Sequence, residues 1–272
     1  MRCALLIPTL AHDGWDRWMP SNLEQTHQAD EIIVVVDRAT TESERKELAT
    51  AWPTITFVFN VDNLGITRSL NVGLSATDAD FIFRADDDDQ SMPDRIERQL
   101  ACFAETGADL VGGWAEGISR DGGTFFERCP TSHDEITRAL LRRNVLIHPT
   151  LAFRREAVTR IGNYDPTFIN AQDYDLYLRG LRHGLKFAAV PAPLIRRRYH
   201  DGNITVRRRM NQLMYSCAAR CVHHAATADR KAFLRTLAQY ALLAIIPAWA
   251  RELRRNVRAR LRSLRQRAGQ TQ

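Results

Sequence analysis

Short apolar runs alternate with longer amphipathic stretches over the first hundred residues of the chain. The apolar runs are rich in β-branched and aromatic side chains and lie at Cys3–Ile7, Ile32–Val36, Ile55–Phe59 and Phe81–Phe83. Such runs are typical of strands buried on both faces of a parallel sheet. The stretches between them have the length of helices and lie at about Trp15–His27, Thr41–Trp52 and Thr67–Thr77. This order predicts an α/β fold with a mostly parallel, Rossmann-like sheet flanked by helices.

The second half of the chain has a more mixed pattern and ends in helices. Two further helices are expected at Pro93–Thr106 and Asp173–His183, and further strands at Leu110–Trp114, Phe187–Val190 and Leu194–Tyr199. From about Arg207 the pattern is wholly helical. We therefore expect a main α/β domain over residues 1–205 and a helical C-terminal extension over residues 206–272.

Positive charge is concentrated at the end of the chain. The net charge is +6, but Arg251–Arg267 contains eight arginines and one glutamate, which leaves the remainder near −1. Four apolar residues of this segment share one helical stripe, Leu253, Val257, Leu261 and Leu264. A basic amphipathic helix of this kind is suited to an anionic membrane surface, and a solvated charged tail is the alternative.

The sequence predicts neither a membrane span nor a secretory segment. The uncharged run Thr236–Ala250 is shorter than the roughly 20 apolar residues that a span needs, and Pro247 interrupts it. The first apolar run ends at Pro8 and is too short for a signal peptide. The five cysteines include no Cys-x-x-Cys pair, which argues against a zinc site. We expect the protein to be cytoplasmic and peripheral at the inner face of the cell membrane.

Polar residues follow three of the predicted strands at the point where each strand ends. Asp37 follows the second strand, Asn60–Gly65 the third and Asp86–Asp89 the fourth. Ligands of open α/β sheets bind beyond the carboxyl ends of the strands, so we expect these residues to form one site. Asp37 taken alone also fits a turn or helix-capping residue.

The four consecutive aspartates Asp86–Asp89 require a cation or basic side chains nearby, because like charges repel. Hard divalent cations prefer carboxylate oxygens, and magnesium sites typically combine one or two carboxylates with substrate phosphates. The cluster therefore predicts a site for Mn²⁺ or Mg²⁺ that also holds a diphosphate. A solvated acidic turn is the alternative.

The stretch Phe81–Gln99 resembles the aspartate-rich region of family 2 glycosyltransferases, with the pattern D-x-D-D followed by Ser-x-Pro-x-Arg. Other segments resemble the family in the same order: Ile32–Asp37, Asn63–Gly65 with Leu70–Leu74, His148–Asp165, Ala171–Arg179 and Tyr199–Thr205. The resemblance covers roughly residues 1–205 and implies the GT-A fold and an inverting reaction. The chain is most similar in these motifs to bacterial enzymes that build cell-surface polysaccharides such as lipopolysaccharide.

The resemblance also implies roles for individual residues. Asp173 is the expected catalytic base, and Asp88 and His200 are the expected metal ligands. Nucleotide contacts are implied for Pro8, Asp37, Asn63, Gly65, Arg68, Asn71, Arg84, Asp86 and Asp87. Contacts with the donor sugar or the acceptor are implied for Asp89, Gly112, Gly113, His148 and Gln172. The family usually has Glu-Asp where this chain has Gln172-Asp173, and Asp173 also fits a helix N-cap.

The expected function is the metal-dependent transfer of a sugar from a nucleotide-sugar to a hydroxyl of a glycan or lipid-linked acceptor. UDP-sugars are favoured as donors, with GDP- and dTDP-sugars open. A nucleotidylyltransferase is a weaker reading, because Pro8–Gly14 supplies no glycine-rich basic loop. A nucleic-acid-binding module would depend on the arginine tail alone, so no nucleic-acid partner is expected. The third alternative, suggested by Gln172, is a catalytically inactive transferase.

Overall fold

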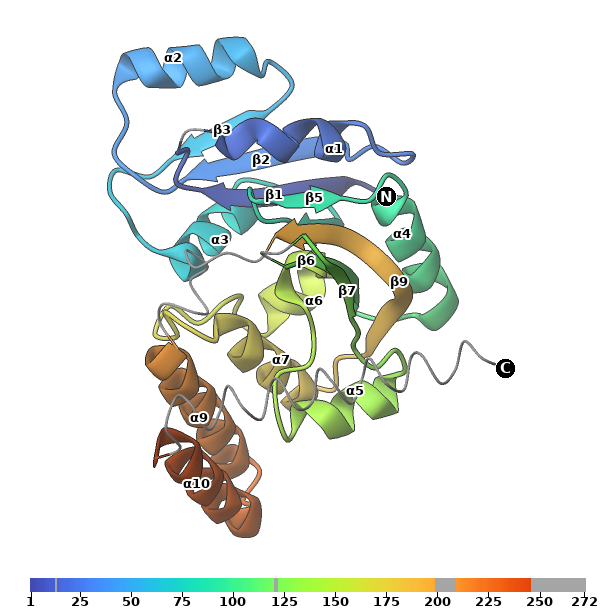
Figure 1. Cartoon of the computed structure of the whole chain (residues 1–272), viewed down its shortest axis with the longest axis vertical. Coiled ribbons are helices and arrows are strands. Elements are labelled where there is room, and N and C mark those ends of the chain that lie inside the picture. Colours follow the sequence, from blue (N-terminus) through green and yellow to red (C-terminus); the bar gives the residue numbers. More distant parts are fainter. Residues whose placement is uncertain (13, 120–121, 199–208, 246–272) are drawn as a thin grey trace.

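The first half of the sheet is made of four parallel strands. The computed structural model describes residues 1–12, 14–119, 122–198 and 209–245. Its first four strands, in spatial order, are β3 (Thr56–Phe59), β2 (Glu31–Val36), β1 (Cys3–Thr9) and β4 (Phe81–Arg84). All three pairings between them are parallel. The helices α2 (Glu42–Ala51) and α3 (Ile66–Ser75) connect these strands, which confirms the α/β order expected from the sequence (Figure 1).

The second half of the sheet mixes parallel and antiparallel strands. β8 (Ala152–Arg154) pairs antiparallel with β4 and with β6 (Leu110–Ile118). β6 pairs parallel with β9 (Phe187–Arg198), and the edge strands β5 (Asp89–Ser91) and β7 (Thr124–Glu127) are antiparallel to their partners. The described residues thus form one nine-stranded sheet that is parallel at one end and mixed at the other.

β9 replaces the two short strands that were expected at Phe187–Val190 and Leu194–Tyr199. Its pairing with β6 shifts register between Gly113 and Ala115, so that Val190 faces Gly113 and Pro193 faces Trp114. The shift accommodates the prolines that made the sequence look interrupted, because a bulge places an unpaired residue outside the ladder.

The expected helix at Trp15–His27 is broken into a 3₁₀ turn, η1 (Trp15–Trp18), and the short helix α1 (Met19–Leu23). Beyond Leu23 the chain is held against the segment before the next long helix. Gln25 Nε2 donates to the carbonyl of Met92 at 2.9 Å, and the amide of Thr26 donates to the carbonyl of Pro93 at 2.9 Å. These tertiary hydrogen bonds override the local helical pattern.

Alternate residues of the first strand enter two separate hydrophobic clusters, one on each face of the sheet. Cys3, Leu5 and Ile7 pack with side chains of α4 (Arg95–Thr106), among them Ile96 and Phe103. Ala4 and Leu6 pack on the other face with α3 and α7 (Gln172–Arg182), through residues that include Leu70, Leu74 and Tyr174. The sheet is therefore covered on both faces, as its apolar runs predicted.

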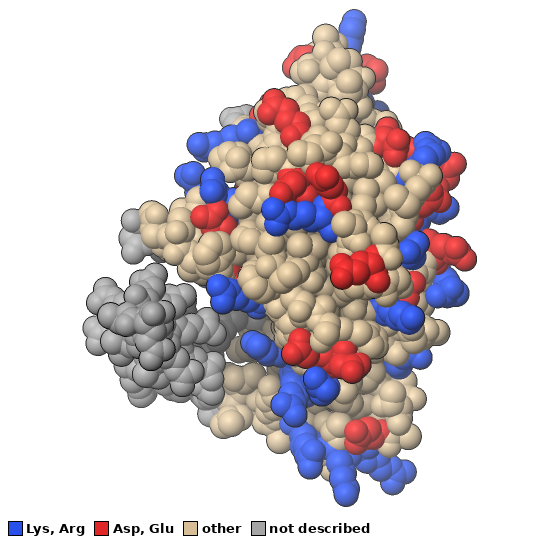
Figure 2. Space-filling view, turned by 90° about the vertical axis from the view of Figure 1, so that its right-hand side faces the viewer, with Lys and Arg blue, Asp and Glu red and all other residues tan. Residues whose placement is uncertain are grey.

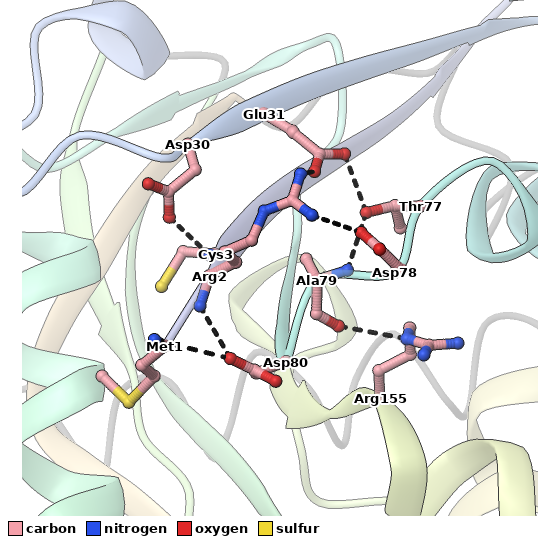
Figure 3. Close-up of polar contacts among 10 residues, drawn as sticks. All are labelled: Met1, Arg2, Cys3, Asp30, Glu31, Thr77, Asp78, Ala79, Asp80 and Arg155. Carbon is pink, nitrogen blue, oxygen red and sulfur yellow. Dashed lines mark hydrogen bonds and ion pairs between the residues drawn. The ribbon is translucent and has the colours of Figure 1, made fainter.

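The amino ends of β1, β2 and β4 are joined by a polar network (Figure 3). Arg2 forms ion pairs with Glu31 and Asp78, and Asp30 Oδ2 accepts from the amide of Cys3 at 2.7 Å. Thr77 Oγ1 donates to Glu31 Oε2 at 2.8 Å. The network ties three strand starts together, which leaves the opposite, carboxyl edge of the sheet for the candidate site.

Two antiparallel helices follow the sheet, α9 (Arg209–Ala226) and α10 (Arg230–Ile245), and we refer to them as the C-terminal hairpin. The hairpin lies beside α7 (Figure 1), and His223 Nδ1 contacts the carbonyl of Leu178 at 3.3 Å. The observed helices confirm a helical C-terminal extension. None of the helices within the described ranges has the length and apolar character needed to cross a membrane. The expected domain boundary at residue 205 and the basic tail lie outside the described residues.

Candidate active site

The carboxyl ends of β1, β2 and β4 lie side by side, and they bring polar residues distant in the sequence together. The amide of Asp37 donates to the carbonyl of Thr9 at 2.8 Å, and Thr9 Oγ1 donates to Asp87 Oδ2 at 2.5 Å. Thr9 follows Pro8 at the end of β1. Its carbonyl bonds to the residue after β2 and its hydroxyl bonds to the turn after β4, so it links the ends of all three strands. The expectation that the polar strand ends share one edge of the sheet is met.

Asp37 shapes the loop that leads into α3. Its Oδ1 accepts from Asn60 Nδ2 and from the amide of Leu64, both at 2.8 Å, and its Oδ2 accepts from the amide of Gly65 at 2.9 Å. Gly65 has φ +82°, a conformation that glycine adopts without steric cost. Both carboxylate oxygens of Asp37 thus hold the loop, while Asn63 of the loop and Arg68 of α3 are exposed. A nucleobase contact by Asp37 stays a prediction.

Asn71 has a structural role, and its expected nucleotide contact stays a prediction. Its Nδ2 donates to the carbonyl of Tyr164 at 2.7 Å, and its Oδ1 accepts from the amide of Tyr164 at 3.1 Å. The side-chain amide therefore clamps α3 to the loop before α7. Tyr164 in turn contacts His148 Nε2 through its hydroxyl at 2.9 Å.

His148 is buried and contacts the hydroxyl of Tyr164. Burial first, and then the nearby Arg84 guanidinium, hold the pKa of His148 well below its usual value, so the ring is neutral. Its edge-to-face contact with Tyr164 occupies the remaining ring surface on that side. The expected contact of His148 with the acceptor or donor sugar is not supported by this position.

Gly112 and Gly113 of β6 are explained by packing. A Cβ on Gly113 would lie 2.2 Å from Leu194 Cδ1, and a Cβ on Gly112 would lie 3.3 Å from Leu146 Cδ2. Core side chains occupy the space above both Cα atoms. Leucine side chains thus account for both glycines, and the expected contact of this backbone with a donor sugar stays a prediction.

Three of the four carboxylates of the aspartate turn lie together, and the fourth points to β1. One oxygen from each of Asp86, Asp88 and Asp89 lies within 4.8 Å of the others, a spacing that suits a shared metal ion. Asp87 instead faces Thr9. Asp87 occupies the variable position of the D-x-D-D pattern, and its expected nucleotide contact stays a prediction. Asp89, expected to contact the sugar or acceptor, joins the group.

The carboxylates of this turn lie close together, with Asp89 buried, Asp86 and Asp87 half-buried and Asp88 exposed. Arg84 pairs with Asp86, and Arg197 pairs with Asp89 at 3.8 Å. Burial, followed by repulsion from Asp86, raises the pKa of Asp89 to about 8. Burial raises the pKa of Asp87 to about 6, and it also raises the pKa of Asp88. Asp89 Oδ2 is buried and has no hydrogen-bond partner among the described residues. A hard divalent cation fits this donor set, because it would supply both the missing partner and the missing charge.

Arg84 is the buried cation at the centre of the site, with 2% of its surface exposed. It forms an ion pair with Asp86, while its Nε and Nη1 atoms have no hydrogen-bond partner within the described part of the chain. Its charge favours the ionised forms of Asp87, Asp88, Asp89 and Asp173. Arg84 thus lies behind the acidic turn and the candidate base, too deep for the expected direct nucleotide contact.

Arg95 and Gln99 hold this arrangement from behind and were not assigned a role from the sequence. Arg95 is fully buried and donates through Nη2 to the carbonyls of Arg84 and Pro149, the latter at 3.0 Å. Gln99 Nε2 donates to the carbonyls of Val111 and Thr150 at 2.9 and 2.8 Å. Their position in and after the Ser-x-Pro-x-Arg motif was the sequence feature that could have indicated this role.

Asp173 lies in the first turn of α7, with 9% of its surface exposed. Burial raises its pKa, and the hydrogen bond from Asn144 Nδ2 to its Oδ2, 2.6 Å long, acts in the opposite direction. Ala171 is the N-cap, so Asp173 does not cap the helix. Gln172 is buried beside it. Nothing in the sequence pointed to Asn144, and the expected metal ligand His200 lies outside the described residues.

Comparison with known proteins agrees with this geometry. The family model described as "Glycosyl transferase family 2" matches residues 17–162, more than half of the chain. The chain belongs to glycosyltransferase family 2. The amylovoran biosynthesis glycosyltransferase AmsE of Erwinia amylovora is 30% identical to this family 2 glycosyltransferase over 212 residues, which cover 73% of the chain and 79% of AmsE.

Two further proteins are similar to this family 2 glycosyltransferase. An Escherichia coli enzyme, UDP-Gal:alpha-D-GlcNAc-diphosphoundecaprenol beta-1,3-galactosyltransferase, is 27% identical over 172 residues, 61% of this chain and 62% of that enzyme. The crystal structure of S. aureus TarS 1-349 in complex with UDP-GlcNAc has a TM-score of 0.66 at 14% identity, covering 82% of this chain and 66% of that chain. The latter likeness establishes the GT-A fold.

Proposed function

We propose that this family 2 glycosyltransferase is an inverting, metal-dependent enzyme that moves a sugar from a UDP-sugar to a hydroxyl of a glycan or lipid-linked acceptor. The observation that carries the proposal is the group of Asp86, Asp88 and Asp89, whose carboxylate oxygens lie within 4.8 Å of one another. The group stands at the carboxyl edge of the sheet, where open α/β folds bind nucleotides.

Each half of the reaction has candidate residues. Asp86, Asp88 and Asp89 would hold Mn²⁺ or Mg²⁺, which neutralises charge developing on the leaving diphosphate. Asp173 would accept the proton of the acceptor hydroxyl as that oxygen attacks the anomeric carbon. A raised pKa makes Asp173 a stronger base than an ordinary aspartate once it is ionised. One displacement at the anomeric carbon inverts its configuration.

The names of similar proteins support the proposed donor and acceptor classes. The E. coli enzyme is named for a UDP-sugar donor and a diphosphoundecaprenol acceptor, and TarS was solved with UDP-GlcNAc. AmsE is named for amylovoran biosynthesis. These names support a UDP-sugar donor, a lipid-linked acceptor and a role in cell-surface polysaccharide synthesis.

We also propose that the protein is peripheral at the cytoplasmic face of the cell membrane, with its basic tail against anionic lipid. In the described part of the C-terminal hairpin, Leu234, Leu237 and Leu242 of α10 are exposed. Figure 2 shows Lys and Arg side chains gathered at the lower end of the molecule, at the height of this hairpin in Figure 1. Apolar and basic side chains together suit an anionic interface.

A thermal-shift screen of UDP, GDP and dTDP, each with and without manganese, tests the donor and the metal together. A ligand that binds only the native state raises the melting temperature. We expect UDP to give the largest rise, and only with manganese present. Equal responses to all three nucleotides, or a response that chelation of the metal leaves unchanged, would count against the proposal.

A further inference from the structure

A pocket of about 350 Å³ lies between the C-terminal hairpin and the loop that follows α5 (His133–Leu140). The loop contributes Arg142, Arg143 and Asn144, and the hairpin contributes Gln212, Leu213, Ser216, Gln239, Tyr240 and Leu243. Its volume falls in the range of small-molecule sites, roughly 300–1,000 Å³. None of these residues belongs to the aspartate turn or to the family motifs.

The pocket is joined to the candidate base by one residue. Asn144 lines the pocket, and its Nδ2 donates to Asp173 Oδ2 at 2.6 Å. A molecule held in the pocket would therefore lie on the hairpin side of the base. The acidic turn is connected to Asp173 separately, through the field of Arg84. The pocket therefore neighbours Asp173 through Asn144, and the aspartate turn neighbours it through Arg84.

The described residues that line the pocket include two arginines and no carboxylate. Arg142 and Arg143 are exposed and form no ion pair with any described residue. Arg220 lies behind the wall with 5% of its surface exposed, and its Nη1 donates to Gln239 Oε1 at 2.8 Å. Its guanidinium lies 5.6 Å from the ring centroid of Tyr240. Arg220 Nε is buried and lacks a hydrogen-bond partner among the described residues.

An anion is the ligand that this arrangement favours. Two guanidinium groups lining one cavity, with a third behind its wall, repel one another unless a negative group lies between them. Guanidinium groups match phosphate oxygens in charge and in geometry. The side chains of Leu213, Leu243 and Tyr240 add apolar wall for carbon atoms. A phosphate attached to a hydrocarbon or sugar uses both kinds of surface.

We infer that this pocket binds the phosphate-bearing end of the acceptor, a glycan joined to a lipid through a diphosphate, and so directs its hydroxyl to Asp173. The inference rests on the proposed function and names the acceptor class for the same site. It assigns acceptor binding to Arg142 and Arg143. Neither arginine has a role in the proposed metal and donor site.

Farnesyl diphosphate is a suitable probe, titrated calorimetrically into the full-length protein in EDTA so that the aspartate turn cannot bind its diphosphate through a metal. The test variant is Arg142→Gln/Arg143→Gln. The control, Lys46→Gln/Arg160→Gln, removes the same charge from exposed positions outside the pocket. We expect the test variant to bind about tenfold more weakly or worse, since charge-assisted hydrogen bonds to phosphate are lost, and the control to match the wild type.

Two further probes separate the parts of the ligand. Farnesol and inorganic pyrophosphate should each bind more weakly than farnesyl diphosphate. Pyrophosphate bound as tightly as the full probe would overturn the lipid-linked assignment, and equal losses in both variants would overturn the assignment to Arg142 and Arg143. No binding of farnesyl diphosphate by the wild type would also overturn it.

Binding of UDP with manganese, measured on the same proteins, distinguishes this inference from the proposed function. Retained UDP binding without farnesyl diphosphate binding would refute the pocket alone. Absence of UDP binding in the wild type would refute the proposed function. Loss of both ligands in the Arg142→Gln/Arg143→Gln variant would contradict a separate acceptor pocket.

Discussion

Arg84 is the residue around which the charges of the site are arranged. A guanidinium with 2% exposure and a single carboxylate partner is costly to bury unless several negative groups lie near it. The aspartate turn and Asp173 supply those groups. At the residue scale, the site is therefore a set of carboxylates that a buried cation holds together and a bound metal would complete.

Asp173 is predicted to be essential for transfer and dispensable for donor binding. Asp173→Asn keeps an oxygen that accepts from Asn144 but loses the basic carboxylate. General-base catalysis typically contributes ~10²–10⁴-fold, so we expect turnover of the UDP-sugar to fall by at least about 10²-fold. UDP affinity, measured by calorimetry, should stay unchanged. Asp165→Asn, in the loop before α7, is the control, and wild-type turnover by Asp173→Asn would contradict the assignment.

The hydrogen bond from Asn144 predicts a pH effect. It favours the ionised form of Asp173, so its loss in Asn144→Ala should raise the pKa of that carboxyl further above its ordinary value. A base must be deprotonated to act, and the acid limb of the kcat profile should therefore move to higher pH. A limb that stays in place or moves to lower pH would show that Asp173 is not the titrating group.

The sequence motifs predicted where the site lies better than they predicted what each side chain contacts. Asp88 was expected from the D-x-D-D pattern and lies at the predicted edge of the sheet, and Asp173 was expected from the Gln172-Asp173 pair and lies in the first turn of α7. Asn71 and His148 were expected at the substrate and instead pack against Tyr164. Sequence pattern places a residue on an element, but only the fold decides which neighbour its side chain reaches.

Helix α4 is the element that supports the strand ends next to the aspartate turn. Arg95 and Gln99, one helical turn apart, reach four backbone carbonyls between them, on β4, β6 and η2 (His148–Thr150). Backbone carbonyls buried without a partner are destabilising. The Ser-x-Pro-x-Arg motif therefore stabilises the sheet edge on which the acidic turn stands.

Arg95→Met is predicted to lower the free energy of unfolding by about 2–4 kcal/mol, because it leaves buried acceptors without donors. Arg98→Met, on the exposed side of the same helix, removes only a surface ion pair with Asp94 and should cost at most ~0.5 kcal/mol. Urea denaturation of both variants measures the difference. Equal effects would show that Arg95 does not brace the site.

Elements that depend on local pattern were predicted well, and elements that depend on distant contacts were not. The parallel strands β1–β4 and helices α2 and α3 follow from apolar runs and helical spacing. The segment after Leu23 leaves the helical conformation because Gln25 and Thr26 are hydrogen-bonded to residues 92 and 93. β9 continues through its prolines because β6 shifts register opposite them.

The whole molecule separates its charges by location. Ion pairs join the strands at the amino edge (Figure 3), carboxylates gather at the carboxyl edge, and arginines are concentrated in the last part of the sequence.

Membrane association is the prediction that belongs to this scale. The full chain should sediment with vesicles containing phosphatidylglycerol, since each basic residue near an anionic surface contributes about 1 kcal/mol. A chain ending at Ile245 should bind them much more weakly, and 0.5 M salt should weaken binding of the full chain. Equal sedimentation with pure phosphatidylcholine vesicles would contradict an electrostatic attachment.

Calorimetric titration of UDP in the presence of manganese tests the central claim most directly, with two variants of adjacent aspartates compared. Asp88→Asn removes a carboxylate from the metal group, whereas Asp87→Asn alters only the side chain that faces Thr9. We predict that Asp88→Asn loses the manganese-dependent part of UDP affinity, by about tenfold or more, and that Asp87→Asn retains it. Wild-type, manganese-dependent affinity in Asp88→Asn would contradict the account.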